Sequence, residues 1–204
     1  MIGKKPKIKM KCDYGARSYS MTFDTGKSQY LGMKPTVRSF SLLPYYSTID
    51  DPSVIEASEH LAEQLQGRDD RIKASVLLSM IQQNIEYASD DSLYGEADVW
   101  GVPISTLCFG EGDCDCMTNL YVSIAHNIGL DVISVVIVGH MFPAVCFEGG
   151  HGRSYQHDGK TYFHMEVTDE LPVAGRFWNY PGSIEAMAAP KVPNDIFRSI
   201  LKKI

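Results

Sequence analysis

The spacing of apolar side chains predicts two amphipathic helices in residues 51–88. In the first helix, Asp51 is a side-chain acceptor at the start, and Pro52 follows where its missing N–H costs no hydrogen bond. Apolar residues then recur at helical spacing as far as Gly67. The second helix is predicted to begin at Asp69 or Asp70 and to end near Ala88. Its apolar stripe consists of Ile72, Val76, Met80, Ile81 and Ile85.

A loop is predicted from 89 to 107, and loops of this length are usually functional or mobile. The pattern then predicts a helix over 117–127, ended by Gly129. The run DVISVVIV at 131–138 is almost entirely apolar and rich in β-branched residues, which is typical of a buried strand. Two more strands are predicted, at MFPAVCF and TYFHMEVTD, and a short helix near the C-terminus at 193–203.

The first 50 residues have a different character. SYSMTF at 18–23 and TVRSFSLL at 36–43 have β character and are separated by glycine and proline. We therefore predict a strand-rich N-terminal segment, residues 1–50, packed on a core domain of residues 51–204. Residues 1–40 hold nine Lys or Arg against two acids, although the whole chain carries a net charge of −6. A basic arm of this kind can dock on an anionic surface, but it is expected here to be a solvated segment folded against the acidic body. Nucleic-acid motifs are absent, so no nucleic-acid partner is expected.

Composition narrows the class further. With 204 residues, of which 44% are hydrophobic, the chain has the composition of an ordinary globular protein. No apolar run approaches the roughly 20 residues that span a bilayer, and none follows the basic start as a signal peptide requires. We expect no membrane span and a cytoplasmic location. The five cysteines are an odd number without framework spacing, which disfavours a disulfide scaffold.

The stretch GEGDCDCMTN at 110–119 carries the candidate chemistry. Cys114 lies where a loop becomes a helix, and free N–H groups there stabilise a thiolate and a developing oxyanion. Asp113 and Asp115 fit a cap and a first-turn acid, but their charges oppose thiolate formation. Cys116 is interpreted as a buried helix residue. A zinc site is a weak alternative, because C-x-C is the wrong spacing for a zinc knuckle and no second pair follows.

A cysteine nucleophile needs a base, and the base needs an acceptor that orients it. His140 begins the second predicted strand, and Glu166 lies on the third. Together with Cys114 they form a candidate Cys–His–Glu triad. His164 is the main rival for the base, because strand alternation places it on the same face as Glu166.

The run NIEYASDDSLYGEADVWGVPISTLCFGEGDCDC at 84–116 resembles the transglutaminase-like cysteine proteinases. The resemblance continues through G-L-D-V at 129–132, G-H at 139–140 and E-V-T at 166–168, and covers about residues 52–170. It implies an α+β, papain-like core in which the nucleophile-bearing helix packs on an antiparallel sheet. It also implies that Cys114 is the nucleophile, His140 the general base and Glu166 the orienting acid.

The function that this resemblance implies is hydrolysis of a peptide or amide bond in a peptide or protein substrate, with no required cofactor. A protein-glutamine acyltransferase using the same triad is an alternative, and a catalytically silent binding module of the same fold is another. Some bacterial members of the family bind calcium through acids flanking the cysteine, which here would be Asp113 and Asp115.

Overall fold

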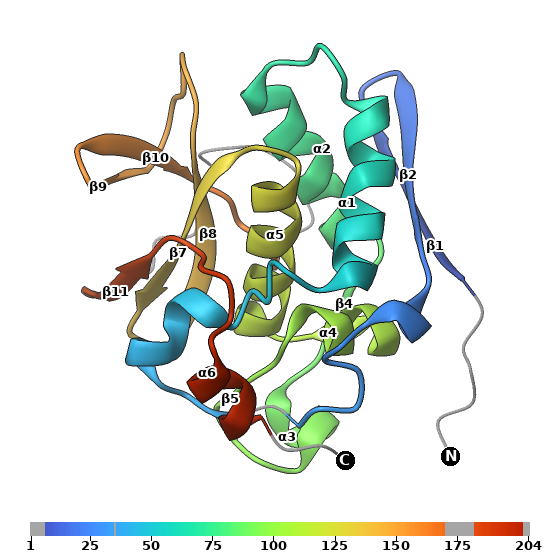
Figure 1. The fold of residues 1–204 in the computed structure, drawn as a ribbon. Helices are drawn as coiled ribbons and strands as arrows, with labels where there is room; N and C mark the ends of the chain where they lie inside the picture. Colours follow the sequence, from blue (N-terminus) through green and yellow to red (C-terminus); the bar gives the residue numbers. More distant parts are fainter. Residues whose placement is uncertain (1–6, 35, 170–181, 202–204) are drawn as a thin grey trace.

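The computed structural model describes residues 7–34, 36–169 and 182–201 (Figure 1). Both predicted helices are present, as α1 (Pro52–Gln64) and α2 (Asp70–Gln82). The Asp51 side chain caps α1 as expected, by accepting from the backbone N–H groups of Ser53 and Val54. The end of α2 was predicted too late. After Gln82 the chain leaves the helix, and the Asn84 side-chain amide bonds the backbone of Lys11 instead.

The C-terminal half forms one antiparallel sheet covered by a helix. Helix α5 (Cys114–Asn127) packs on strands β7 (Asp131–Ile137) and β8 (His140–Cys146). The strand order is β11-β7-β8-β10-β9, where β9 is Ser154–His157, β10 is Lys160–His164 and β11 is Ile184–Ala188. Every pairing in this sheet is antiparallel. The molecule thus has the predicted α+β architecture, with the candidate nucleophile at the start of the helix that packs on the sheet.

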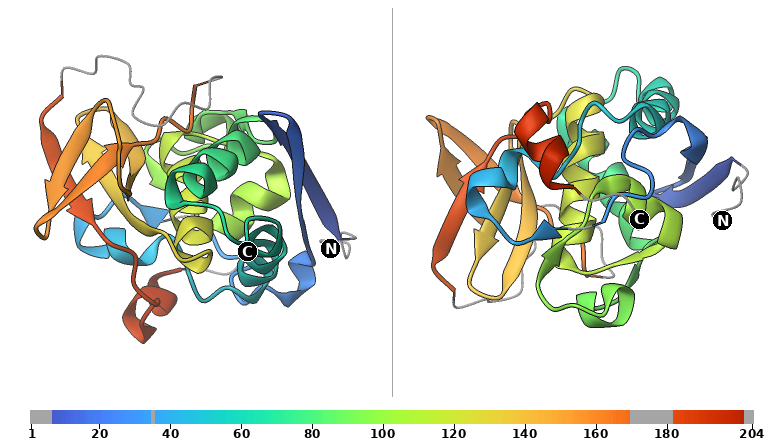
Figure 2. Two further views of the ribbon diagram at one scale, coloured as in Figure 1. Left: turned by 90° about the horizontal axis from the view of Figure 1, so that it is seen from above. Right: turned by 60° about the horizontal axis from the view of Figure 1, so that its bottom comes forward.

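The elements form successive layers, which two further views make clear (Figure 2). The sheet lies on one side, α5 comes next, and α1 and α2 separate α5 from a hairpin on the far side. The hairpin pairs β1 (Ile8–Tyr14) with β2 (Arg17–Phe23), which confirms the predicted strand at 18–23. Its apolar residues belong to the same buried cluster as those of α1, α2 and α5. The division into segments 1–50 and 51–204 stays a prediction.

The predicted strand at 36–43 is mostly wrong. Only β3 (Thr36–Val37) is extended, and it pairs with β5 (Val99–Trp100). The chain then turns into the 3-10 helix η2 (Phe40–Tyr45). Leu43 and Tyr46 are fully buried in a cluster with Trp100 and Phe197, so tertiary packing overrides the β propensity of this stretch. A shorter 3-10 helix, η1 (Thr25–Lys27), connects the hairpin to this region.

The predicted loop at 89–107 also needs correction, because it contains two short helices. Helix α3 (Asp90–Tyr94) has two acids in its first turn, and α4 (Pro103–Phe109) begins at a proline. Each ends at a glycine in the left-handed conformation, Gly95 or Gly110, which is a common helix stop. Between and around them, β5 pairs with β3, and β4 (Glu86–Tyr87) pairs with β6 (Glu111–Gly112).

Two predictions about the C-terminal part change. The third predicted strand is shorter than 161–169, because β10 ends at His164 and Glu166 lies just beyond it. The strand β11 was not predicted. The C-terminal helix is present as α6 (Asp195–Ile200), within the expected 193–203; residues 202–203 of that range and the tail 170–181 lie outside the described residues. In the described part of the chain, no helix has the length and apolarity needed to cross a membrane.

Candidate active site

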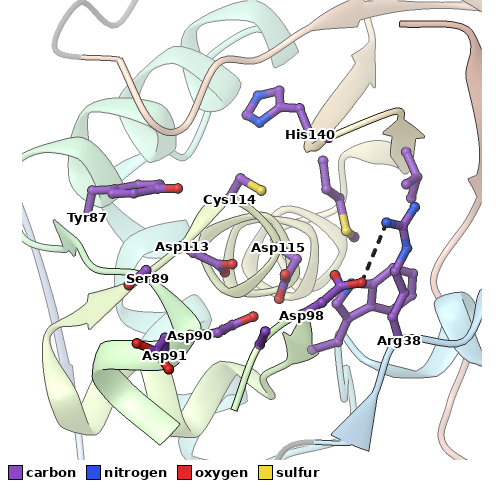
Figure 3. A pocket seen from close by; sticks show the side chains of 15 residues that line it. Arg38, Tyr87, Ser89, Asp90, Asp91, Asp98, Asp113, Cys114, Asp115 and His140 are labelled. Atoms are coloured by element: carbon purple, nitrogen blue, oxygen red, sulfur yellow. Dashed lines mark ion pairs between the residues drawn. The ribbon is translucent and has the colours of Figure 1, made fainter. Parts of the chain in front are cut away.

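The sulfur-bearing residue Cys114 is the first residue of α5. Asp113 caps this helix, since its side chain accepts from the backbone N–H of Cys116 at 3.2 Å. Cys114 is half-buried and lines a cavity of about 340 Å³. Figure 3 shows its side chain between His140 on one side and the carboxylates of Asp113 and Asp115 on the other.

His140 opens strand β8 and lines the same cavity. It follows Gly139, whose φ of +77° makes the tight turn from β7 possible at low cost. The register pairs His140 with Ile137 at the end of the ladder. The sequence therefore brings a helix start and a strand start to one cavity. The Nε2 atom of the His140 ring lies 3.1 Å from Glu166 Oε2.

Glu166 reaches this point from just beyond β10, because its backbone is fixed by two neighbouring bonds. The N–H of Met165 donates to Pro143 O at 2.9 Å, and the Gln82 side chain donates to Glu166 O at 2.8 Å. Glu166 is 1% exposed. Burial acts to raise the pKa of Glu166, but hydrogen bonds from His140, His164 and Thr168 outweigh it and hold that pKa well below its usual range.

His164, the rival base, is placed differently. It is 1% exposed, and it is not among the described residues that line the cavity of Cys114. Its Nε2 lies 3.2 Å from Glu166 Oε2, so it shares the acid with His140 from the buried side. Strand alternation was expected to place His164 and Glu166 on the same face of the third strand. The two side chains do meet, but alternation is not the reason, because Glu166 lies beyond the end of β10.

Opposing effects act on the pKa of the Cys114 thiol. Burial and the charges of Asp113 and Asp115 raise the pKa of the Cys114 thiol, and a backbone contact with Met141 acts to lower it. Together these effects raise the pKa of the Cys114 thiol above its ordinary value. The thiol is therefore neutral at neutral pH in this state, and its chemistry depends on a base that removes the proton as attack begins.

A third carboxylate, which the sequence reasoning missed, joins the acids beside Cys114. Asp90 on α3 lines the same cavity and lies close enough to Asp113 and Cys116 for one ion to contact all three. Burial, Asp113 and Asp98 raise the pKa of Asp90 to about 6. Among the described residues, Asp90 Oδ1 and Asp115 Oδ1 are buried oxygens without a hydrogen-bond partner. In the sequence, the adjacent acids Asp90 and Asp91 in the predicted loop were the signal that could have pointed to this third carboxylate.

Comparisons with known proteins give only distant likenesses. No protein-family model matches the chain, and no curated protein has a similar sequence. Among solved structures, Legionella pneumophila LapG has a TM-score of 0.42 and 12% identity, over 69% of this chain and 78% of that chain. The EGTA-treated form of LapG has a TM-score of 0.42 and 13% identity, over 68% of this chain and 75% of that chain. A candidate cysteine protease from Cytophaga hutchinsonii has a TM-score of 0.42 and 11% identity, over 98% of this chain and 71% of that chain.

Proposed function

We propose that this protein is a thiol-dependent hydrolase that cleaves a peptide or amide bond through an acyl-thioester on Cys114. His140 is the general base and Glu166 the orienting acid. The observation that carries the proposal is that Cys114 and His140 line one cavity while His140 Nε2 is bonded to the buried Glu166 carboxylate. A surface cysteine or a core histidine would have no need of this combination.

The hydrogen bond between His140 and Glu166 supports separate roles for the two ring nitrogens of His140. A carboxylate only accepts, so His140 Nε2 carries a proton toward Glu166, and Nδ1 is the nitrogen that takes the thiol proton. As the sulfur attacks the carbonyl carbon, that proton moves to Nδ1 and then to the leaving amine when the C–N bond breaks. Water, deprotonated by the same nitrogen, attacks the thioester carbon; the C–S bond breaks, the acid is released, and the proton on Nδ1 returns to the Cys114 sulfur. The Cys114 backbone N–H at the helix start is the oxyanion donor that we assign.

The acids beside Cys114 fit a calcium ion. Calcium prefers carboxylate oxygens. Asp113 belongs to two overlapping groups of possible ligands, one with Asp90 and Cys116 and the other with Cys114 and Asp115. Asp90 and Asp115 each have a buried oxygen with no partner among the described residues. We propose that an ion there binds Asp113 together with Asp90, with Asp115 on the other side of Asp113. Bound there, calcium would offset the negative charges that raise the pKa of the Cys114 thiol.

The test is intact-mass detection of an acyl adduct after mixing the protein with a library of peptides and amides. We expect an adduct on the wild-type protein and on Cys116→Ala, and none on Cys114→Ala. His140→Ala should form it at least 100-fold more slowly, because general-base catalysis contributes about 10²–10⁴-fold.

Two outcomes would contradict the proposal. An adduct that survives in Cys114→Ala would place the chemistry elsewhere, and a folded protein that forms no adduct would fit the silent module. Adding a primary amine distinguishes hydrolysis from acyl transfer, because only an acyltransferase gives an amide product in place of the free acid.

A further inference from the structure

The Glu166 carboxylate is held by partners on both of its oxygens. Oε2 faces two imidazoles, His140 Nε2 at 3.1 Å and His164 Nε2 at 3.2 Å. Oε1 accepts from the backbone N–H of Thr168 at 3.2 Å and from its hydroxyl at 2.7 Å. A Cys–His–Glu triad needs only the contact between His140 and Glu166. The second imidazole on the same oxygen is therefore a feature that the proposed function leaves unexplained.

The surroundings of His164 select one protonation state. Its Nδ1 lies 3.3 Å from the Tyr155 hydroxyl, and its Nε2 faces an oxygen that can only accept. Burial lowers the pKa of His164, Glu166 acts to raise it, and the positive charge of Arg153 acts to lower it. A neutral ring with its proton on Nε2 satisfies both contacts, because Nδ1 then accepts from Tyr155.

The ring of His164 is also fixed in place by packing. Phe142 on β8 lies 4.1 Å from it between ring centroids, at an interplanar angle of 33°. The same Phe142 ring lies 5.9 Å from His140 and 5.2 Å from Tyr155. One aromatic side chain thus contacts both imidazoles that meet at Glu166, and the hydrogen-bonded chain runs from Tyr155 through His164 to Glu166 and His140.

We propose that His164 is a positioning residue for the reaction: its neutral Nε2–H donates to Glu166 Oε2, aims that oxygen at His140 and withdraws part of its charge. This inference rests on the proposed function, since it takes His140 as the base. Without His164 the carboxylate keeps its charge for His140 alone and loses one of the contacts that fix its orientation.

The experiment compares His164→Gln, which keeps a donor in place of Nε2–H, with His164→Phe, which keeps the ring but has no donor. We expect His164→Phe to lower kcat about tenfold with little change in KM, at the low end of the 10–100-fold loss seen when orienting partners of a metal-bound histidine are removed. His164→Gln should recover most of that loss. In proton NMR, the His140 ring N–H signal should move downfield in His164→Phe and return in His164→Gln.

Several results would overturn the inference. One is wild-type kcat and an unmoved His140 signal in His164→Phe; another is a His164→Gln protein as impaired as His164→Phe while equally folded. If His164→Phe does not fold, ¹⁵N spectra of wild-type His164 decide: a proton on Nε2 alone supports the inference, and an imidazolium or an Nδ1–H ring contradicts it. These spectra need no substrate, so an inactive wild-type protein would refute the proposed function and leave the role of His164 in holding Glu166 measurable.

Discussion

At the scale of single residues, two glycines leave room for Cys116 behind the candidate nucleophile. A Cβ on Gly101 would lie 2.7 Å from Cys116 Sγ, and one on Gly112 would lie 2.7 Å from Cys116 Cβ. Cys116 is fully buried, so it cannot move aside cheaply. We expect Gly101→Ala to lower the free energy of unfolding by about 1–3 kcal/mol, the usual cost of overpacking a core. Urea denaturation measures this loss.

The control is the double variant Gly101→Ala with Cys116→Ala. Removing the sulfur should restore part of the loss, giving a coupling of about 0.5–3 kcal/mol between the two sites, as is usual for residues in contact. Strictly additive losses would show that the clash with Cys116 is not the cause.

At the scale of elements, α1 and α2 each begin at an aspartate cap, but the two caps differ in burial. Asp51 is fully buried, accepts from Ser53 N at 2.8 Å and from the Ser28 hydroxyl, and so joins α1 to the chain after the hairpin. Asp69 is exposed and accepts from Ile72 N at 2.8 Å. We expect Asp69→Ala to cost about 1 kcal/mol, as an ordinary cap does.

Asp51→Ala should cost about 1–3 kcal/mol more than Asp69→Ala, because it also leaves buried donors without their acceptor. Chemical denaturation of the two variants side by side gives the difference. Equal losses would mean that Asp51 acts only as a helix cap and that its bond to Ser28 adds no stability.

At the scale of the whole molecule, the acidic cluster links α3 to the start of α5, so an ion bound there would stabilise the fold. Calcium at about 100 times its Kd would add about 2.7 kcal/mol. For a chain of this size, that raises Tm by about 5–10 °C relative to the protein in EGTA. Differential scanning calorimetry with and without EGTA measures the shift.

Asp90→Asn should lose most of this calcium-dependent shift. Asp158→Asn should keep it, since Asp158 is a highly exposed residue that lies outside the cluster. An identical Tm in calcium and in EGTA for the wild-type protein would contradict the proposed ligands.

Local signals in the sequence predicted much of the fold. The caps at Asp51, Asp69 and Asp113, the apolar stripes of α1 and α2 and the β-branched run of β7 all depend on neighbours within a few residues. The same is true of Cys114 at a helix start. Where local preference and tertiary packing disagree, as in residues 36–43, the sequence prediction was wrong, because burial of Leu43 and Tyr46 outweighs β propensity.

By itself, then, the sequence determined the longer helices α1, α2 and α5 and the buried strands β7 and β8, that the architecture is α+β, and which residues carry reactive groups. Only the tertiary structure decided which of those groups meet: that Asp90 joins the acids of α5, and that His140 and His164 share one oxygen of Glu166. The reason is physical. Helix caps and apolar periodicity are fixed by contacts close in the chain, whereas the position of a side chain in a shared site depends on how separate elements pack against one another.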